Sequence, residues 1–303
     1  MKVLIICFSQ TGNTRKVAEC IQEWIKEVTD SCELIRLEDV NKAALAGYDL
    51  VGIGFPVFYY KEPFHISDFI ETLPLLRGKQ WFVFCSHGSV LGMTLISMTE
   101  RLEEKGITVI GSHHTYADAS LPFYPYPTVT TGHPDDQDLQ EAVEFGKSIA
   151  ACSMTVAKGN TDCIKRPAPI TEDWVPEQSA LLTQEFMDKA FPRLSINTET
   201  CTQCGECQDA CPVDGIDIEA EPPRIQDLCI YCWNCAKICP TCSIETDWTA
   251  MDGLAPSQYE KYIKALNDAE ARGEFRWRVD PDSMNYDDPL HKQRERQLKE
   301  DKK

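Results

Sequence analysis

The sequence predicts an α/β protein with a doubly wound parallel sheet of five strands, in the order 2-1-3-4-5, followed by a second, smaller α+β domain. In the first half of the 303-residue chain, apolar runs bounded by Gly, Asp and Pro alternate with helical patterns. Strands that are apolar throughout and separated by helices are typical of a parallel sheet covered on both faces. In the second half, two copies of one cysteine pattern lie 28 residues apart.

The first half contains all the elements of this sheet. Strands are expected at residues 3–7, 33–37, 50–55, 81–85 and from 107 toward 116. Helices are expected at residues 13–28, 62–73, 91–104 and 135–151. In the first helix, one face carries Val17, Ile21, Trp24, Ile25 and Val28. In such a fold, a ligand binds beside the first strand, where the strand order reverses.

The loop between the first strand and the first helix has the composition of a phosphate-binding turn. Residues 9–14 supply three hydroxyl groups and two amide side chains around one glycine. The free N–H groups and the partial positive charge of the helix N-terminus complete a site for a phosphate dianion. A plain N-cap needs only one such residue. A Walker A lysine and a G-x-G-x-x-G motif are both missing here, which disfavours ATP and dinucleotides.

The two cysteine motifs indicate iron–sulfur chemistry. Each reads C-x2-C-x2-C-x3-C, and a proline follows each, at Pro212 and Pro240. A cubane cluster needs four thiolates, and in the bacterial two-cluster arrangement the fourth cysteine of each motif ligates the other cluster. One [4Fe-4S] cluster is therefore assigned to Cys201, Cys204, Cys207 and Cys239. The other is assigned to Cys229, Cys232, Cys235 and Cys211.

Disulfides and structural zinc are the alternatives for these cysteines. Disulfides suit small secreted domains, and this chain shows neither that size nor an export signal. Zinc sites use pairs of ligands, whereas each motif offers three close cysteines and a fourth before proline. The seven cysteines outside the motifs are expected to be mostly free thiols in a reducing cytoplasm.

Two known families resemble these two halves. Residues 195–247, which carry the cysteine motifs, resemble a bacterial-type ferredoxin with two [4Fe-4S] clusters. Residues 1–157 resemble a flavodoxin, whose first loop holds the phosphate of flavin mononucleotide (FMN). The resemblance implies that Gly12 allows the turn, and that the phosphate loop also comprises Ser9, Gln10, Thr11, Asn13 and Thr14.

Two further loops are implied at the isoalloxazine ring. One contributes Pro56, Val57, Phe58 and Tyr59. Phe58 or Tyr59 is expected to stack on the flavin, with plain core packing as the alternative. The other loop contributes Ser86, His87 and Gly88. His87 lies where flavodoxins usually bring an acidic residue, so it is expected to raise the flavin potential; solvation or a backbone hydrogen bond is the alternative.

The remaining segments connect or cover these domains. Residues 158–194 are expected to form a linker with a bridging helix, and residues 248–303 a polar C-terminal extension. Residues 121–127 alternate proline with aromatics, so they either line the flavin, pack against the ferredoxin-like half or form a surface loop. Trp233 is expected to shield the second cluster from water. Cys242 is interpreted as a small buried residue, and His113 and His114 are assigned no metal.

The net charge limits the kinds of binding partner. A value of −18 argues against nucleic acid and anionic membranes as partners, and it favours a redox partner with a basic docking patch. No apolar stretch is long enough to span a bilayer. We expect a low-potential electron-transfer protein that passes electrons between FMN and two clusters to a partner enzyme in anaerobic metabolism. The alternatives are an FMN-dependent reductase of a quinone or enoate, and a dedicated activator of one metalloenzyme.

Overall fold

The computed structural model describes residues 1–119 and 121–301 and divides into two compact units. The first unit comprises Met1–Asp118 and Gly132–Ala180. The second comprises Ala119–Thr131 and Leu181–Lys303. The segment 119–131 therefore belongs to the second unit, although it follows the fifth strand in sequence.

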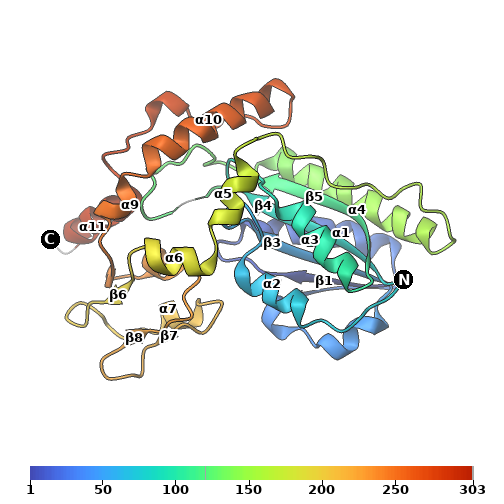
Figure 1. The fold of residues 1–303 in the computed structure, drawn as a ribbon, viewed down its shortest axis with the longest axis horizontal. Helices are drawn as coiled ribbons and strands as arrows, with labels where there is room; N and C mark the ends of the chain where they lie inside the picture. Colours follow the sequence, from blue (N-terminus) through green and yellow to red (C-terminus); the bar gives the residue numbers. More distant parts are fainter. Residues whose placement is uncertain (120, 302–303) are drawn as a thin grey trace. The chain divides into compact units, whose positions relative to one another are not determined.

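The first unit is built on a five-stranded parallel sheet in the order β2-β1-β3-β4-β5, which confirms the predicted topology (Figure 1). Its strands are β1 Lys2–Cys7, β2 Ser31–Arg36, β3 Leu50–Pro56, β4 Gln80–His87 and β5 Thr108–Tyr116. Pro56 pairs with Ser86, and His87 pairs with Tyr116. The carboxyl ends of the strands thus lie along one edge, where the predicted cofactor loops begin.

Helices cover both faces of this sheet (Figure 1). On one face, α2 Phe64–Glu71 and α3 Thr94–Glu104 pack on Trp81 and Val83. On the other, α1 Asn13–Val28 and α4 Asp136–Val156 pack on Phe82 and Phe84. The large rings need space on the neighbouring strand: a Cβ atom on Gly54 would lie 2.0 Å from the Phe84 ring.

Shorter elements complete the first unit. They are η1 Leu37–Asp39, η2 Lys42–Gly47 and α5 Val175–Leu181, which reaches the boundary with the second unit. Cys152 of α4 forms a disulfide with Cys163, a link that the sequence analysis did not predict. The other cysteines outside the motifs are free thiols, as expected: Cys7, Cys20, Cys32, Cys85 and Cys242.

The centre of the second unit is an internal duplication with small antiparallel sheets. β6 Ser195–Ile196 pairs with β9 Ile244–Glu245, and β7 Ile216–Asp217 pairs with β8 Arg224–Ile225. The short helices α7 Glu206–Asp209 and α8 Asn234–Ile238 each begin inside one cysteine motif, and α6 Gln184–Ala190 precedes both. Strands of two residues bury little surface, so other interactions must hold this region together.

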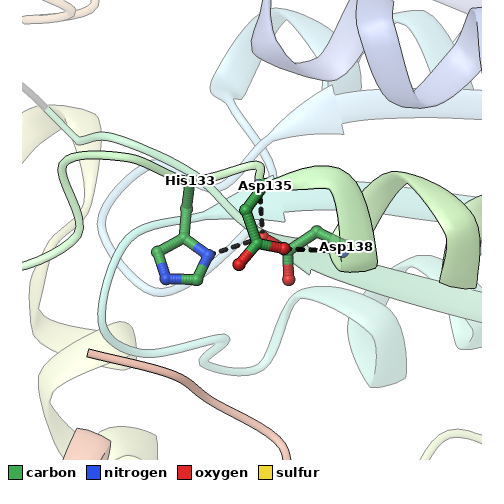
Figure 2. Close-up of side chains that lie close together, drawn as sticks. All are labelled: His133, Asp135 and Asp138. Atoms are coloured by element: carbon green, nitrogen blue, oxygen red, sulfur yellow. Dashed lines mark hydrogen bonds and ion pairs between the residues drawn. The ribbon is translucent and has the colours of Figure 1, made fainter. Parts of the chain in front are cut away.

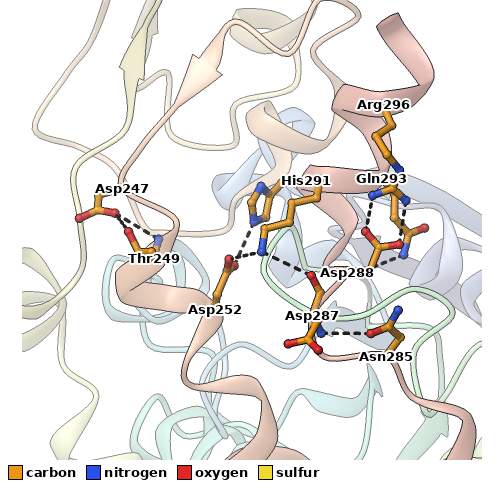
Figure 3. Close-up of polar contacts among 10 residues, drawn as sticks. Asp247, Thr249, Asp252, Asn285, Asp287, Asp288, His291, Gln293 and Arg296 are labelled. Atoms are coloured by element: carbon orange, nitrogen blue, oxygen red, sulfur yellow. Dashed lines mark hydrogen bonds and ion pairs between the residues drawn. The ribbon is translucent and has the colours of Figure 1, made fainter. Parts of the chain in front are cut away.

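The C-terminal extension is folded into the second unit. It contains α9 Thr249–Asp252, α10 Ala255–Ala271, η3 Pro281–Ser283 and α11 Leu290–Asp301. Figure 3 shows Asp252 beside His291, whose Nε2 lies 3.0 Å from Asp252 Oδ1. Asp252 also forms an ion pair with Lys292 Nζ at 3.2 Å. Arg296 pairs with both carboxylate oxygens of Asp288. These contacts fix α11 against α9 and against the turn before it.

None of the helices in the described ranges has the length and apolar character that crossing a bilayer requires.

Candidate cofactor sites

The loop after β1 presents an open helix N-terminus. Gly12 is the N-cap of α1, with φ 87°, a left-handed conformation that glycine adopts without strain. It offers no side chain to cap the first N–H groups, and a Cβ atom there would meet none of the described atoms within 4 Å. The helix N-terminus, which carries partial positive charge, is therefore accessible to an anionic group.

The polar side chains of this loop differ in their roles. The Arg15 backbone N–H donates to Ser9 Oγ at 3.3 Å, which orders the turn. Gln10 Nε2 is buried and has no hydrogen-bond partner among the described residues. Buried donors in native proteins are almost always satisfied, so this orphaned amide fits a ligand oxygen. The open N-terminus and the Gln10 amide together suit the phosphate of FMN.

Asn13 and Thr14 are held by partners from outside the loop. Asn13 Nδ2 donates to the Asp118 carbonyl at 3.4 Å. Thr14 is buried, and its Oγ1 lies 2.7 Å from Ser86 Oγ at the end of β4. Two residues predicted in separate cofactor loops thus contact each other directly. That contact joins the start of α1 to the end of β4, 72 residues away in the chain, so no local pattern could have predicted it.

The loop after β3 is a tight turn beside the first loop. Phe58 and Lys61 exchange two backbone hydrogen bonds, and Tyr59 and Tyr60 between them adopt left-handed φ angles of 52° and 65°. The Phe58 ring packs edge-on against Phe8, with centroids 6.3 Å apart. Phe58, one of the two stacking candidates, therefore contacts the residue preceding Ser9.

His87 is buried at the end of β4, and its Nε2 lies 3.0 Å from His114 Nδ1. Burial and the neighbouring His114 hold the pKa of His87 well below its usual value, so the imidazole is neutral. The alternative of a solvated surface histidine is therefore wrong. The loop after β4 is also joined to the loop after β3, because the Val57 N–H donates to the Ser86 carbonyl at 2.8 Å.

Sequence analysis missed His65 at this edge of the sheet. Its ring packs edge-on against Phe8 with centroids 4.4 Å apart. Both ring nitrogens are buried and have no hydrogen-bond partner within the described ranges. Burial lowers the pKa of His65 to about 4. A lone histidine at the start of α2 could not be singled out from the sequence, because Phe8, on which it packs, follows a distant strand.

A buried polar group at the start of α4 is explained by helix capping. Figure 2 shows His133, Asp135 and Asp138 close together. The Asp135 side chain accepts from the Asp138 N–H at 2.9 Å, and the Asp138 side chain accepts from the Asp135 N–H at 2.8 Å. His133 Nδ1 lies 2.5 Å from Asp138 Oδ2. This is a capping box with a histidine added, and its own hydrogen bonds account for all three residues.

The backbone of the two cysteine motifs repeats residue by residue. Left-handed φ angles occur at positions related by 28 residues: Gln203 and Tyr231, Gly205 and Trp233, Asp214 and Cys242. Cys242 is half-buried rather than fully buried as predicted, and it occupies the strained position that Asp214 occupies in the first repeat. The duplication therefore extends to the conformation of each loop.

Backbone amides point at the thiol sulfurs in the same repeating pattern. The N–H groups of Gln203 and Tyr231 donate to Cys201 and Cys229, each at 3.4 Å. The N–H groups of Gly215 and Ser243 donate to Cys211 and Cys239, each at 3.2 Å. Amide donors of this kind stabilise thiolate sulfur and set the potential of a cluster.

The thiols interact in two groups that cross the motifs. Burial and the thiols of Cys239 and Cys204 raise the pKa of Cys207. Burial and the thiols of Cys232, Cys229 and Cys211 raise the pKa of Cys235. In each group, the fourth cysteine comes from the other motif. This grouping fits two cubanes with the crossed ligands that the spacing predicts, and it is the donor set that such clusters require.

The second motif is surrounded by aromatic side chains from its own unit. The Trp233 ring, 1% exposed, lies 5.5 Å from Phe123, 5.8 Å from Trp248 and 6.1 Å from Phe191. Tyr231 also packs on Phe191, at 5.5 Å. Phe123 belongs to the proline–aromatic segment, so that segment packs on the cysteine-rich unit, one of the three alternatives left open by the sequence.

Comparisons with known proteins agree with both halves. Residues 4–107 match the flavodoxin domain family, and residues 193–240 match the 4Fe-4S dicluster domain family. The chain is 32% identical to a flavodoxin of Megasphaera elsdenii over 36% of its own length and 82% of that protein. It is 31% identical to a ferredoxin of Methanothermococcus thermolithotrophicus over 17% of its own length and 92% of that protein. A solved archaeal flavodoxin is 26% identical, with a TM-score of 0.41, over 51% of this chain and 99% of that one.

The chain therefore belongs to the flavodoxin family through its first unit, and it carries a dicluster ferredoxin domain in its second. It is a flavodoxin–ferredoxin fusion with an electron-transfer role. The two domains imply FMN and iron–sulfur clusters as cofactors.

Proposed function

We propose that this protein passes electrons between FMN, held at the carboxyl edge of the parallel sheet, and two [4Fe-4S] clusters, and on to a partner redox protein in the cytoplasm of an anaerobic cell. FMN exchanges one or two electrons and each cubane one, so the cofactors supply the redox chemistry. The residues of the chain bind them, orient them and control their access to water.

The flavin site is proposed at the three loops that follow β1, β3 and β4. The N-terminus of α1 and Gln10 Nε2 would hold the phosphate, since Gly12 has no side chain to cap the helix and the Gln10 amide is unsatisfied. Phe58 would lie against the ring, because it already packs at the first loop. His87 would stay neutral beside the flavin and leave its potential higher than a carboxylate would. The full set proposed is Ser9, Gln10, Thr11, Gly12, Asn13, Thr14, Pro56, Val57, Phe58, Tyr59, Ser86, His87 and Gly88.

The cluster ligands are proposed as two crossed sets. One cluster would take Cys201, Cys204, Cys207 and Cys239. The other would take Cys229, Cys232, Cys235 and Cys211. Two observations support this: Cys207 of the first motif and Cys239 of the second lie in one buried cluster, and the Cys211 thiol lies near enough to Cys235 to help raise its pKa. In each pair, one cysteine is the last cysteine of the other motif.

Anaerobic purification with quantification of iron, sulfide and flavin tests the proposal. We expect about eight iron and eight sulfide per FMN, the content of two cubanes and one flavin. Replacing Cys239 with Ala should remove one ligand of the first cluster and leave the spectrum of the second. Loss of both spectra, or of only the second, would contradict the crossed assignment, and zinc in place of iron would contradict the function.

The partner is proposed to be a protein with a basic docking surface, because the chain carries a net charge of −18. A panel of quinones and enoates separates this role from that of a small-molecule reductase. Rapid turnover of one of them, without a protein partner, would favour the reductase.

A further inference from the structure

The two cysteine motifs have the same backbone but different surroundings. In the first motif, the side chains between the cysteines include three that are exposed: Thr202, Gln203 and Glu206. The residues 28 positions later are buried: Ile230, Tyr231 and Asn234. Cys204 is exposed, whereas its counterpart Cys232 is half-buried. The first motif therefore has an exposed edge, whereas the corresponding edge of the second motif is covered.

Three segments close the second motif. Tyr231 Oη donates to Asp188 of α6 at 3.1 Å, and Gln184 of the same helix donates to the Cys229 carbonyl at 2.8 Å. The segment 119–131 contributes the contact between Phe123 and Trp233. These groups occupy the positions that a partner protein would need to reach the second motif.

The C-terminal helix adds a third cover. Arg294 of α11 donates from Nη1 to the Ala236 carbonyl at 2.6 Å and from Nη2 to the Cys239 carbonyl at 2.7 Å. His291, one turn earlier, stacks on Trp248 with ring centroids 5.0 Å apart. The extension that lies beyond the ferredoxin-like repeat is therefore packed on the second repeat.

The open motif is uniformly acidic. Residues 197–222 contain seven carboxylates and no Lys, Arg or His. Exposed carboxylates next to the cysteines belong to Glu199, Glu206 and Asp209, and none of the three forms an ion pair with any described residue. By contrast, Lys237 and Arg294 lie at the second motif. The charge around the uncovered edge thus complements a positively charged protein surface.

We propose that a redox partner with a basic surface docks on the first motif at the edge of Cys204, and that electrons enter or leave the protein there rather than at the second motif. The proposal rests on the cluster ligation of the proposed function. In each encounter, one electron moves between the cluster of the first motif and the one-electron centre of the partner. One centre is oxidised as the other is reduced, and no bond forms or breaks.

The second cluster is then an internal relay. Electron tunnelling weakens steeply with distance, and the aromatic and helical cover keeps a partner's redox centre away from Cys232 and Cys235. The same cover excludes water, which favours a low potential. The first motif, by contrast, exposes Cys204 to the solvent, as a terminal exchange site must.

Chemical cross-linking tests the docking surface without relying on turnover. The full-length, anaerobically purified protein is mixed at low salt with cytochrome c, a basic one-electron haem protein. Carbodiimide joins contacting carboxylates and lysines, and mass spectrometry locates the links. We expect links at Glu199, Glu206 and Asp209. Links concentrated at Glu260 and Glu270 of α10, or along the first unit, would overturn the proposal.

Charge reversal tests whether the same surface carries the electrons. The test variant replaces Glu199 and Glu206 with Lys, and the matched control replaces Glu260 and Glu270, two exposed carboxylates of α10, with Lys. At low salt, the test variant should reduce cytochrome c about tenfold more slowly and with weaker salt dependence, while the control changes little. Equal effects, or a larger effect of the control, would contradict the assignment.

Cofactor content separates this proposal from the function on which it depends. Iron and flavin are measured on every variant before the kinetics. A wild-type protein without iron would refute the proposed function, whereas the cross-link map would still report where a basic protein docks. An iron-loaded protein whose links avoid the first motif would refute only the docking site.

Discussion

The parallel-sheet unit and the cysteine-rich unit are stabilised in different ways. In the first, β4 alone buries Trp81, Phe82, Val83 and Phe84 completely, so burial of apolar surface can drive folding without a cofactor. In the second, the strands of the repeat have two residues each, and two of the predicted cluster ligands, Cys207 and Cys239, are themselves among its buried side chains. The comparison teaches that one unit is specified by its hydrophobic pattern and the other by ligand spacing and aromatic packing.

Removing iron should produce the largest difference in stability between the two units. Treating the anaerobic protein with a chelator is expected to abolish hydrogen-exchange protection across residues 195–247, because cluster binding contributes the folding energy that short strands lack. The strands β1, β3 and β4 should stay protected. Equal loss in both units, or no loss in either, would contradict the comparison.

Truncating Trp233 should affect only the second unit. Replacement of this buried residue by Ala is expected to destabilise that unit by about 3–5 kcal/mol and to raise the potential of the second cluster as water enters. The control variant is Gln203→Ala, which should have little effect. Gln203 is exposed, and it corresponds to Tyr231 of the second motif. Denaturant unfolding and EPR-monitored titration measure both quantities.

Adding one methyl group at Gly54 should affect only the first unit. Gly54→Ala places a Cβ atom against the Phe84 ring and is expected to cost about 1–3 kcal/mol of unfolding free energy. Gly47→Ala is the matched control, since a Cβ atom there meets none of the described atoms within 4 Å. Iron content should be unchanged in both. A control as destabilised as the test variant would show that overpacking is not the cause.

Mild acid should also destabilise the first unit. Burial lowers the pKa of His65 to about 4, and burial together with His114 lowers the pKa of His113 to about 3. Between these values and about 6.5, the unfolded chain binds protons that the folded unit does not, so stability falls as pH falls through this window. Unfolding of a variant with His65→Asn and His113→Asn should depend less on pH; an unchanged slope would show that other groups are responsible.

The order of the sheet was predictable because it follows from local patterns. The strands β1, β3 and β4 are built on continuous apolar runs, and alternation with helices leaves few topologies for a parallel sheet. The dicluster domain was predictable for a different reason, since the cysteine spacing itself encodes iron–sulfur chemistry. The predicted phosphate loop is an intermediate case. Its composition indicates a phosphate site, but the hydrogen bond between Thr14 and Ser86 could not be predicted from it.

Most of the unpredicted features depend on contacts between distant parts of the chain. The sequence alone does not show that Arg294 reaches the Cys239 carbonyl, 55 residues away. Nor does it show that Phe123 packs on Trp233 or that Cys152 bonds to Cys163. The three loops at the carboxyl edge of the sheet meet because their strands end together, and His65 lies beside Phe8 there without any local signal.

Reductive titration of the anaerobic holoprotein tests the central claim most directly. Electrons are added stoichiometrically while flavin absorbance and cluster EPR are followed in the same sample. The account predicts an uptake of about four electrons per chain, two by FMN and one by each cubane, with both signals from a single polypeptide. An uptake of only about two electrons, confined to either the flavin or the clusters, would contradict it.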